Sequence, residues 1–251
     1  MIGVLDAAQL TGRSRSHLVD LAGEDGMLHP AAAGAYLALR AAAARDGIGL
    51  RALSAFRDFE RQLLLWNEKF SGRRPVLDRD ARPLDLSQMS DEQIVRAILH
   101  WSALPGASRH HWGTEIDVID GRAPSSGGPV RLLPAEFAPG GPYARLDGWL
   151  GEHAGRFGFF RPYDADRGGV QPEPWHLSYA PVADRALRAL TPALLADTLS
   201  GVHIEGSAVI ARELAMIHAR YVCAIAPPGV ALGAPAIPLQ DTQSFSQAFL
   251  K

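Results

Sequence analysis

Cysteine is nearly absent from this sequence, because Cys223 is the only one among 251 residues. A single cysteine excludes a disulfide within the chain and any metal site built on several thiolates. Cys223 lies in an apolar stretch, residues 217–226. We therefore expect it to be a small buried side chain and not a reactive thiol.

The sequence also lacks a long apolar run, so no segment is a candidate for a membrane-spanning helix. Its first residues show no basic segment followed by an apolar one, the pattern of a secretory signal. As printed, the sequence predicts a cytoplasmic protein. A leader removed from the chain, or another export route, would instead place the protein in the periplasm or the cell envelope.

Charge of one sign is not concentrated anywhere in the chain, whose formal net charge is -2. No basic stripe indicates nucleic-acid binding, and no polybasic run indicates a membrane surface. Apolar residues make up 47% and charged residues 21%, a balance that supports a sizeable globular core. We expect a monomer that binds no nucleic acid.

Helical and strand patterns follow one another without a repeating strand–helix–strand unit, which favours an α+β fold. Apolar periodicity and capping residues predict helices over residues 31–45, 58–70, 91–101 and 143–157, and more between 181 and 226. Short strands are expected over residues 50–56, 114–119 and 175–179. We predict a small antiparallel sheet flanked by helices, with extra helices at both termini.

Two long segments rich in proline, glycine and polar residues interrupt these elements, residues 71–88 and 121–142. Loops of this length are often functional lids. The chain ends in a Pro/Ala-rich segment that we expect to be loosely held. We predict one domain over residues 1–226, with a core at about 30–190 and a helical extension at about 191–226, and then a tail over 227–251.

Side chains that bind metals concentrate between Ser108 and Asp117 and recur at His176. Zinc accepts imidazole nitrogen and carboxylate oxygen, and a catalytic zinc site keeps three protein ligands and one position for water. His110, Asp117 and His176 supply such a set. Gly113 permits a sharp turn after His110, so the next strand can carry Asp117 back to the same ion. The sequence therefore predicts a zinc site on the sheet.

Alternation along the strand after this turn places Glu115 and Asp117 on one face, and Ile116 and Val118 on the other. We expect the two apolar side chains to enter the core, while Asp117 faces a cleft. Three interpretations of Glu115 stay open: a partner of a metal ligand, a substrate contact, or a charge at the rim of the cleft.

Glu173 precedes His176 by three residues, and Pro174 disfavours regular strand pairing between them. We expect Glu173 to lie just before the strand and to reach over the open side of the metal. There it would act as the general base, taking a proton from the attacking water and passing it to the leaving amine.

Each of three residues near the candidate ligands has two possible roles. Trp175 packs beside the metal and orients His176, or it is only a core aromatic. Ser108 donates a hydrogen bond to a substrate peptide group, or it shapes its loop. His111 lines the substrate cleft, or it only packs.

The segments SRHHWGTEID (residues 108–117) and EPWH (173–176) together resemble the signature of the D-alanyl-D-alanine carboxypeptidases of the VanY type. This family belongs to the wider group of lysostaphin-type peptidases and hedgehog domains. The upstream segment SAFR (54–57), with Gln62 after it, is similar to the family's Ser-x-Tyr-Arg motif. The resemblance covers about residues 50–180, with Phe56 in place of the usual tyrosine and Glu115 in place of a frequent alanine.

The resemblance implies a zinc-dependent peptidase that removes the terminal D-alanine from peptidoglycan stem peptides or muropeptides. It implies that Arg57 stabilises the developing oxyanion or holds the substrate, a role that suits a fixed guanidinium in a water-poor site. The residues expected at the substrate are Ser108, Gln62, Trp175, His111 and Glu115.

Two alternatives remain beside this interpretation. The first is an endolysin-like endopeptidase of the same family, and the loops at 71–88 and 121–142 would decide between it and a carboxypeptidase. The second is a non-catalytic zinc-containing module that binds cell-wall material, against which the retention of both Glu173 and Arg57 argues.

Overall fold

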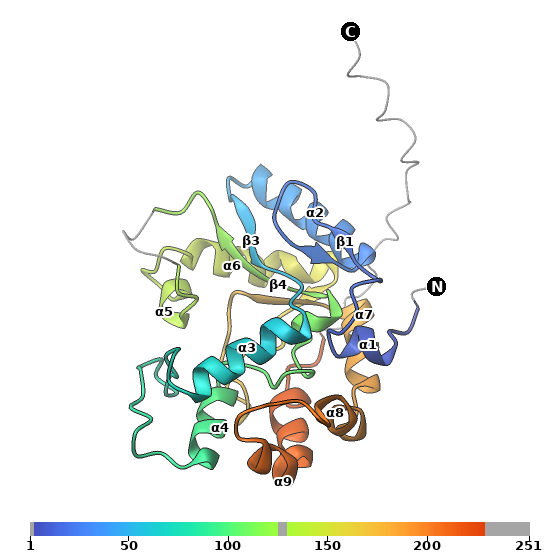
Figure 1. Cartoon of the computed structure of the whole chain (residues 1–251). Helices are drawn as coiled ribbons and strands as arrows, with labels where there is room; N and C mark the ends of the chain where they lie inside the picture. Colours follow the sequence, from blue (N-terminus) through green and yellow to red (C-terminus); the bar gives the residue numbers. More distant parts are fainter. Residues whose placement is uncertain (1–2, 125–129, 229–251) are drawn as a thin grey trace.

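The structure is a computed structural model that describes residues 3–124 and 130–228 (Figure 1). Its main sheet has four antiparallel strands in the order β3-β4-β6-β5, and a separate hairpin pairs β1 with β2. The strands are β1 (Val19–Asp20), β2 (Met27–Leu28), β3 (Leu50–Ser54), β4 (Glu115–Asp120), β5 (Phe159–Phe160) and β6 (His176–Tyr179). The predicted α+β fold with a small antiparallel sheet is confirmed.

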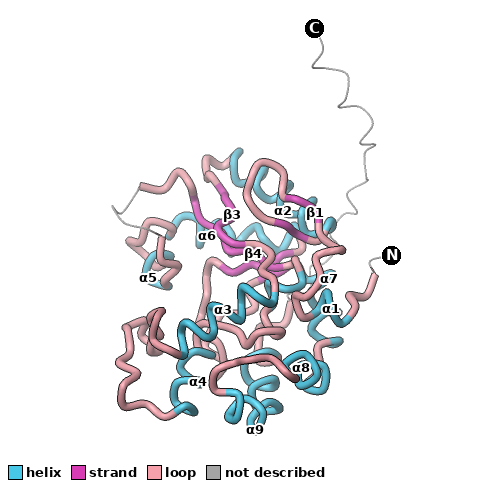
Figure 2. Tube along the Cα trace, in the orientation of Figure 1, coloured by secondary structure: helices cyan, strands magenta, loops and turns pink. Residues whose placement is uncertain are grey.

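Helices lie on both sides of this sheet, with α2 near β3 and with α4, α8 and α9 grouped beyond α3 (Figures 1 and 2). Within the described ranges no helix has the length and apolar character needed to cross a membrane. The α-helices are α1 (Ala7–Leu10), α2 (Pro30–Arg45), α3 (Phe59–Phe70), α4 (Asp91–Leu99), α5 (Pro134–Phe137), α6 (Ala144–His153), α7 (Ala180–Ala189), α8 (Pro192–Leu199) and α9 (Ser207–Ile217). Short 3-10 helices span Arg109–Trp112 and Ala154–Phe157, and a π-helical turn spans His218–Val222.

Capping side chains set the starts of the helices near the sheet. The Asp58 carboxylate accepts a hydrogen bond from the backbone N–H of Arg61 at 2.8 Å, so α3 begins directly after the SAFR segment. Ser90 and Gln93 form a capping box at the start of α4. The start of α3 is therefore fixed next to the end of β3, where Arg57 lies.

Apolar side chains form two cores that flank the sheet. One core joins α2 and α6 to the strands, and Ile116 and Val118 are fully buried in it, as the alternation along β4 predicts. The other core joins α3, α4, α7, α8 and α9. Asp117 lines a cavity together with residues of α3, so the β4 face that carries Asp117 looks toward the second group of helices.

Several elements differ from the predictions made from sequence. The strand predicted to reach residue 56 ends at Ser54, beside a shift of register between Ala52 and Ser54. The segment predicted as a loop over 121–142 contains α5, and its residues 125–129 lie outside the described part. Strand β5 lies between the helix predicted over 143–157 and the strand predicted over 175–179, where no strand was expected. Residues 71–88 contain no helix or strand, as expected.

Cys223 is exposed, so the prediction of a buried side chain is wrong. It follows the buried residues Tyr221 and Val222, directly after the end of the π-helical turn. Helices α8 and α9 occupy the predicted C-terminal extension and pack into the same core as α4. The division into core, extension and tail stays a prediction, and the tail beyond residue 228 lies outside the described ranges.

Candidate metal centre and active-site pocket

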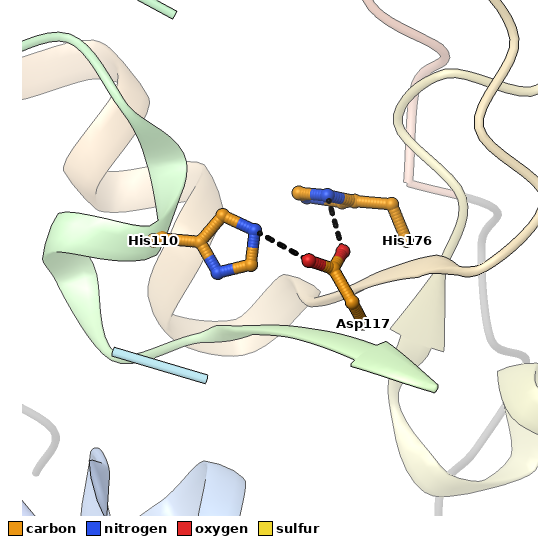
Figure 3. Close-up of side chains that lie close together, drawn as sticks. All are labelled: His110, Asp117 and His176. Atoms are coloured by element: carbon orange, nitrogen blue, oxygen red, sulfur yellow. Dashed lines mark ion pairs between the residues drawn. The ribbon is translucent and has the colours of Figure 1, made fainter. Parts of the chain in front are cut away.

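Three side chains from separate elements meet on one face of the sheet (Figure 3). His110 comes from the 3-10 helix before β4, Asp117 from β4, and His176 from β6, where it pairs directly with Asp117. Nε2 of His110 lies 3.4 Å from Oδ2 of Asp117, and Nδ1 of His176 lies 3.2 Å from Oδ1. One ligand atom from each residue lies within 4.8 Å of the others, close enough to hold one metal ion.

Gly113 makes the turn that brings His110 and Asp117 together. Its φ is 68°, a left-handed conformation that a side chain disfavours. A Cβ at this position would overlap Cδ2 of Leu18 and would lie 3.0 Å from the backbone nitrogen of His29. The local requirement for glycine is therefore both conformational and steric.

The second nitrogen of each imidazole is held by an acceptor. Nδ1 of His110 lies 2.7 Å from the carbonyl oxygen of Ala55, and Nε2 of His176 lies 2.9 Å from Oε2 of Glu115. Because these acceptors require N–H donors, the neutral rings direct Nε2 of His110 and Nδ1 of His176 at the shared space.

The donor set fits a divalent cation such as zinc. Oδ1 of Asp117 is buried and accepts no hydrogen bond from the described residues, so its lone pairs face the space between the two rings. Two imidazole nitrogens and one carboxylate oxygen are the ligands of many catalytic zinc sites, which leave a fourth position for water. His110, Asp117 and His176 could therefore hold zinc.

Electrostatics in the metal-free protein agree with a cation site. Burial lowers the pKa of His176, but the adjacent carboxylates of Asp117, Glu115 and Glu173 outweigh burial and raise it well above the usual value. Burial raises the pKa of Asp117, but the imidazoles of His110 and His176 hold it well below its ordinary range. The carboxylates around His176 thus favour a positive charge at this place, which a bound metal ion would supply.

The structure places Glu173 just before β6 and beside the candidate ligands. Its Oε2 lies 3.4 Å from Nδ1 of His176, and its side chain is 12% exposed. Its backbone N–H donates to the carbonyl of Tyr163 at 2.9 Å, which ties this segment to the chain after β5. The carboxylate lines the same cavity as the candidate ligands and can contact both water and a bound peptide.

Arg57 reaches the same cavity from the segment between β3 and α3. Its guanidinium donates to Oε1 of Gln62 at 3.0 Å and to Oγ of Ser54 at 3.2 Å, and its backbone N–H donates to the carbonyl of His110. Gln62 is fully buried and does not line the cavity, and its Nε2 donates to the carbonyl of Ala103 at 2.7 Å. The position of Gln62 fits a residue that holds Arg57 and not one that contacts substrate.

Of the other residues expected at the substrate, Ser108 and Trp175 line the cavity and His111 does not. The Trp175 ring packs against Phe137 with their centroids 5.6 Å apart. His111 is fully buried, with Nδ1 2.6 Å from the Arg57 carbonyl and Nε2 accepting from the Gly106 N–H. Burial lowers its pKa to about 3. The position of His111 therefore fits the interpretation that it only packs, and not that it lines the substrate cleft.

Glu115 is also fully buried and absent from the cavity wall, so its position does not fit a substrate contact or a rim charge. Its carboxylate lies behind His176, on the side away from Asp117. Of the three interpretations left open by the sequence, a partner of a metal ligand fits this position.

The cavity has a volume of about 340 Å³ and a cationic wall that the sequence did not reveal. Lys69, Arg74 and Arg131 line it together with Arg57, and Tyr163 adds its ring beside His176. Leu65 and Lys69 both line the cavity and are four residues apart on α3, so they lie on the same face of this helix. This helical spacing was the one feature of the sequence that could have linked Lys69 to the cavity.

Lys69 differs from Arg74, another cation of this wall. Arg74 forms an ion pair with Glu68, whereas the ammonium group of Lys69 has no ion pair or hydrogen bond within the described part of the chain. Burial and the nearby charges of Arg57 and Arg74 lower the pKa of Lys69 to about 8, against the opposing effect of Glu173. Lys69 thus presents to the cavity an ammonium group that forms no ion pair with the described residues.

Comparisons with known proteins point to one family. Residues 25–182, more than half of the chain, match the family model described as VanY, D-alanyl-D-alanine carboxypeptidase. A Haemophilus influenzae protein described as uncharacterized is 48% identical over 103 residues, which cover 40% of this chain and 70% of the relative. A D-alanyl-D-alanine carboxypeptidase of Enterococcus faecalis is 30% identical over 141 residues, 55% of this chain and 42% of that protein.

Among solved structures, VanYB in complex with D-alanine-D-alanine is similar to this chain. The superposition has a TM-score of 0.49 at 23% sequence identity, and it covers 76% of this chain and 91% of that one.

Proposed function

Because the chain belongs to the VanY family of D-alanyl-D-alanine carboxypeptidases, we propose that it removes the terminal D-alanine from peptidoglycan stem peptides or muropeptides with the help of a bound zinc ion. At the level of the family, the chain is a peptidase that acts on peptidoglycan peptides. His110, Asp117 and His176 hold the zinc, Glu173 is the general base, and Arg57 faces the scissile carbonyl.

One observation supports cleavage at a chain end: the metal-type ligands and an uncompensated cation line the same cavity. A carboxypeptidase must distinguish a free carboxylate from a continuing peptide, and a positively charged partner is the direct way to do so. Lys69 has no anionic partner within the described residues, so its ammonium group is available to a substrate carboxylate.

Each proposed role follows from position. When bound, zinc supplies a Lewis acid that polarises the scissile carbonyl and lowers the pKa of water. Glu173 takes a proton from the attacking water and delivers it to the leaving amine nitrogen as the C–N bond breaks. The Arg57 guanidinium, fixed by Gln62 and Ser54, stabilises the negative charge that develops on the carbonyl oxygen.

The test compares two stem pentapeptides that differ only at the end, one with a free carboxylate and one with a C-terminal amide. Zinc-loaded protein should release D-alanine from the free acid, as detected by mass spectrometry, and should leave the amide intact. The matched variant Glu173→Ala should bind zinc and release no D-alanine. An untouched free acid in the presence of zinc would refute the proposal.

A second candidate, an endopeptidase, is favoured by one observation. A neighbouring cavity shares Arg57 and Leu65 with the first and extends past Arg15 and Arg61 toward Gly26, which would give room for a longer peptide. Cleavage of the amide peptide, or of a bond inside the stem, would support this candidate. If the wild type releases no more product than Glu173→Ala, the result would instead support a non-catalytic binding module.

A further inference from the structure

The two oxygens of the Glu115 carboxylate have different partners. Oε1 accepts hydrogen bonds from Oγ1 of Thr114 at 2.9 Å, Oγ of Ser178 at 2.8 Å and Nη2 of Arg109 at 3.3 Å. Oε2 faces Nε2 of His176 at 2.9 Å. Three donors therefore fix one oxygen, which leaves the other oxygen for the imidazole of a candidate metal ligand.

This arrangement is sealed from solvent. Glu115, Thr114 and Ser178 are fully buried, and Arg109 is 3% exposed. Because a buried carboxylate is very unfavourable without a positive partner, Arg109 is the group that makes its presence here tolerable.

Arg109 is itself held in place from several directions. Its Nη2 also donates to Oγ of Ser178 at 2.6 Å, and its guanidinium carbon lies 4.7 Å from the centroid of the Trp112 ring. Arg109 belongs to the 3-10 helix that carries His110, Glu115 to β4, and Ser178 to β6, the strand of His176. The network therefore links the three elements that supply the candidate metal ligands.

We infer that Glu115 is a positioning residue for metal binding: it holds the Nε2–H of His176 so that Nδ1 faces the ion, and Arg109 balances its charge. The inference rests on the proposed function, because it assumes that the site binds zinc. A carboxylate behind a ligating imidazole fixes ring orientation and increases the basicity of the ligand nitrogen. His110 has a backbone carbonyl in the corresponding position, which no side-chain substitution removes.

The experiment measures the zinc Kd by chelator competition for the wild type, Glu115→Gln and Glu115→Ala. We expect the Glu115→Ala protein to bind zinc about 10- to 100-fold more weakly. Glu115→Gln should lose less affinity, because an amide oxygen can still accept from Nε2–H. Should Glu115→Ala fail to fold, the nearly isosteric Glu115→Gln carries the test alone.

Glu24→Gln is the matched control. Glu24 is another carboxylate with little exposure, 9% of its side chain, and it accepts hydrogen bonds from Tyr36, Arg40 and the backbone N–H of Ala52. It does not line the cavity. Its neutralisation should lower the free energy of unfolding and leave the zinc Kd unchanged, which separates loss of a buried charge from loss of ligand positioning.

A second measurement follows the imidazole itself. In zinc-loaded protein labelled at histidine, the Nε2–H proton of His176 should give a slowly exchanging downfield NMR signal. The signal should persist in Glu24→Gln, shift in Glu115→Gln and disappear in Glu115→Ala. If the folded Glu115 variants show an unchanged zinc Kd and an unchanged NMR signal, this inference is overturned. The proposed function still stands in that case, provided that the wild type binds zinc and releases D-alanine. A wild type that binds no zinc would overturn both proposals.

Discussion

Oε2 of Glu173 lies 3.4 Å from Nδ1 of His176, the nitrogen that also faces Asp117. Glu173 is nevertheless outside the group of candidate ligands formed by His110, Asp117 and His176. A carboxylate beside the ion but not bound to it is well placed to accept a proton from water at the open coordination position. Metal binding and proton transfer can therefore be separated by substitution.

Glu173→Gln should remove proton transfer and preserve the metal. We expect kcat to fall about 10²- to 10⁴-fold, the range for loss of a general base, because the amide cannot accept the proton. Zinc content per chain, measured by atomic emission, should stay equal to that of the wild type. Turnover of a D-alanine-ended peptide at more than a tenth of the wild-type rate would contradict the assigned role.

Substitution of Arg57 should lower kcat more than it raises KM. Loss of one oxyanion-stabilising donor typically lowers kcat about 10²- to 10³-fold, and we expect this for Arg57→Gln. Arg57→Lys should recover only part of the rate, because an ammonium group cannot reach Gln62 and Ser54 in the same fork geometry. Steady-state kinetics separate kcat from KM. A pure increase in KM would show that Arg57 binds substrate instead.

Much of this site follows from local rules, which explains what the sequence could predict. Strand alternation separates Asp117 from Ile116, and the positive φ of Gly113 folds the chain back after His110. The pairing of Asp117 with His176 joins segments far apart in the chain, so the zinc-type donor set and the resemblance to a known family indicated it, and local spacing did not.

The features that the sequence could not predict depend on docking between elements. Lys69, Arg74 and Arg131 lie in polar segments whose charges are ordinarily solvated, and they share a cavity although only Lys69 belongs to α3. The burial of Glu115 likewise depends on Arg109, which reaches it from another element. Strand β5 was missed because two residues are too few to show alternation.

Lys69 predicts an alkaline limb in the pH profile. Its pKa of about 8 means that the ammonium form dominates below this pH and the neutral amine above it. If the ammonium binds the substrate carboxylate, kcat/KM should fall as pH rises through 8, because kcat/KM reports the free enzyme. Lys69→Met should show a raised KM at pH 7 and no such limb, whereas Lys69→Arg should move the limb to higher pH. A limb that persists in Lys69→Met would exclude this assignment.

Zinc binding should release a proton. The pKa of His176 is raised well above its usual value in the folded metal-free protein, so zinc must compete with a proton for Nδ1. The apparent Kd should therefore tighten by about tenfold per pH unit until pH passes the raised pKa of His176, and should then level off. Calorimetry in buffers of different ionisation enthalpy measures the released protons. A Kd independent of pH between 6 and 7 would rule out this exchange.

The same raised pKa predicts how the stability of the metal-free protein depends on pH. A group whose pKa is higher in the folded state contributes stability that is complete below its unfolded value, which is 6.5 here, and is lost as pH rises through the folded value. The metal-free protein should thus lose unfolding free energy above pH 6.5, and added zinc should raise Tm more at pH 8 than at pH 6. Thermal denaturation with and without zinc measures both effects.

Gly113→Ala should destabilise the fold for two separable reasons. A left-handed φ of 68° with a side chain is unfavourable by about 1–2 kcal/mol. The overlap with Leu18 and the 3.0 Å approach to the His29 nitrogen should add about 1–3 kcal/mol. Gly72→Ala is the matched control, because Gly72 has a φ of 73° and nothing within 4 Å of the added Cβ.

Urea unfolding of the two metal-free variants therefore isolates the steric part, and Gly113→Ala should lose more unfolding free energy than Gly72→Ala. Gly113→Ala should also weaken zinc binding, since any shift of this turn moves His110 relative to Asp117, whereas Gly72 lies outside the cavity wall. Equal losses of stability with equal zinc affinity in both variants would mean that the turn tolerates a side chain, and that the close packing around Gly113 does not set the geometry of the metal centre.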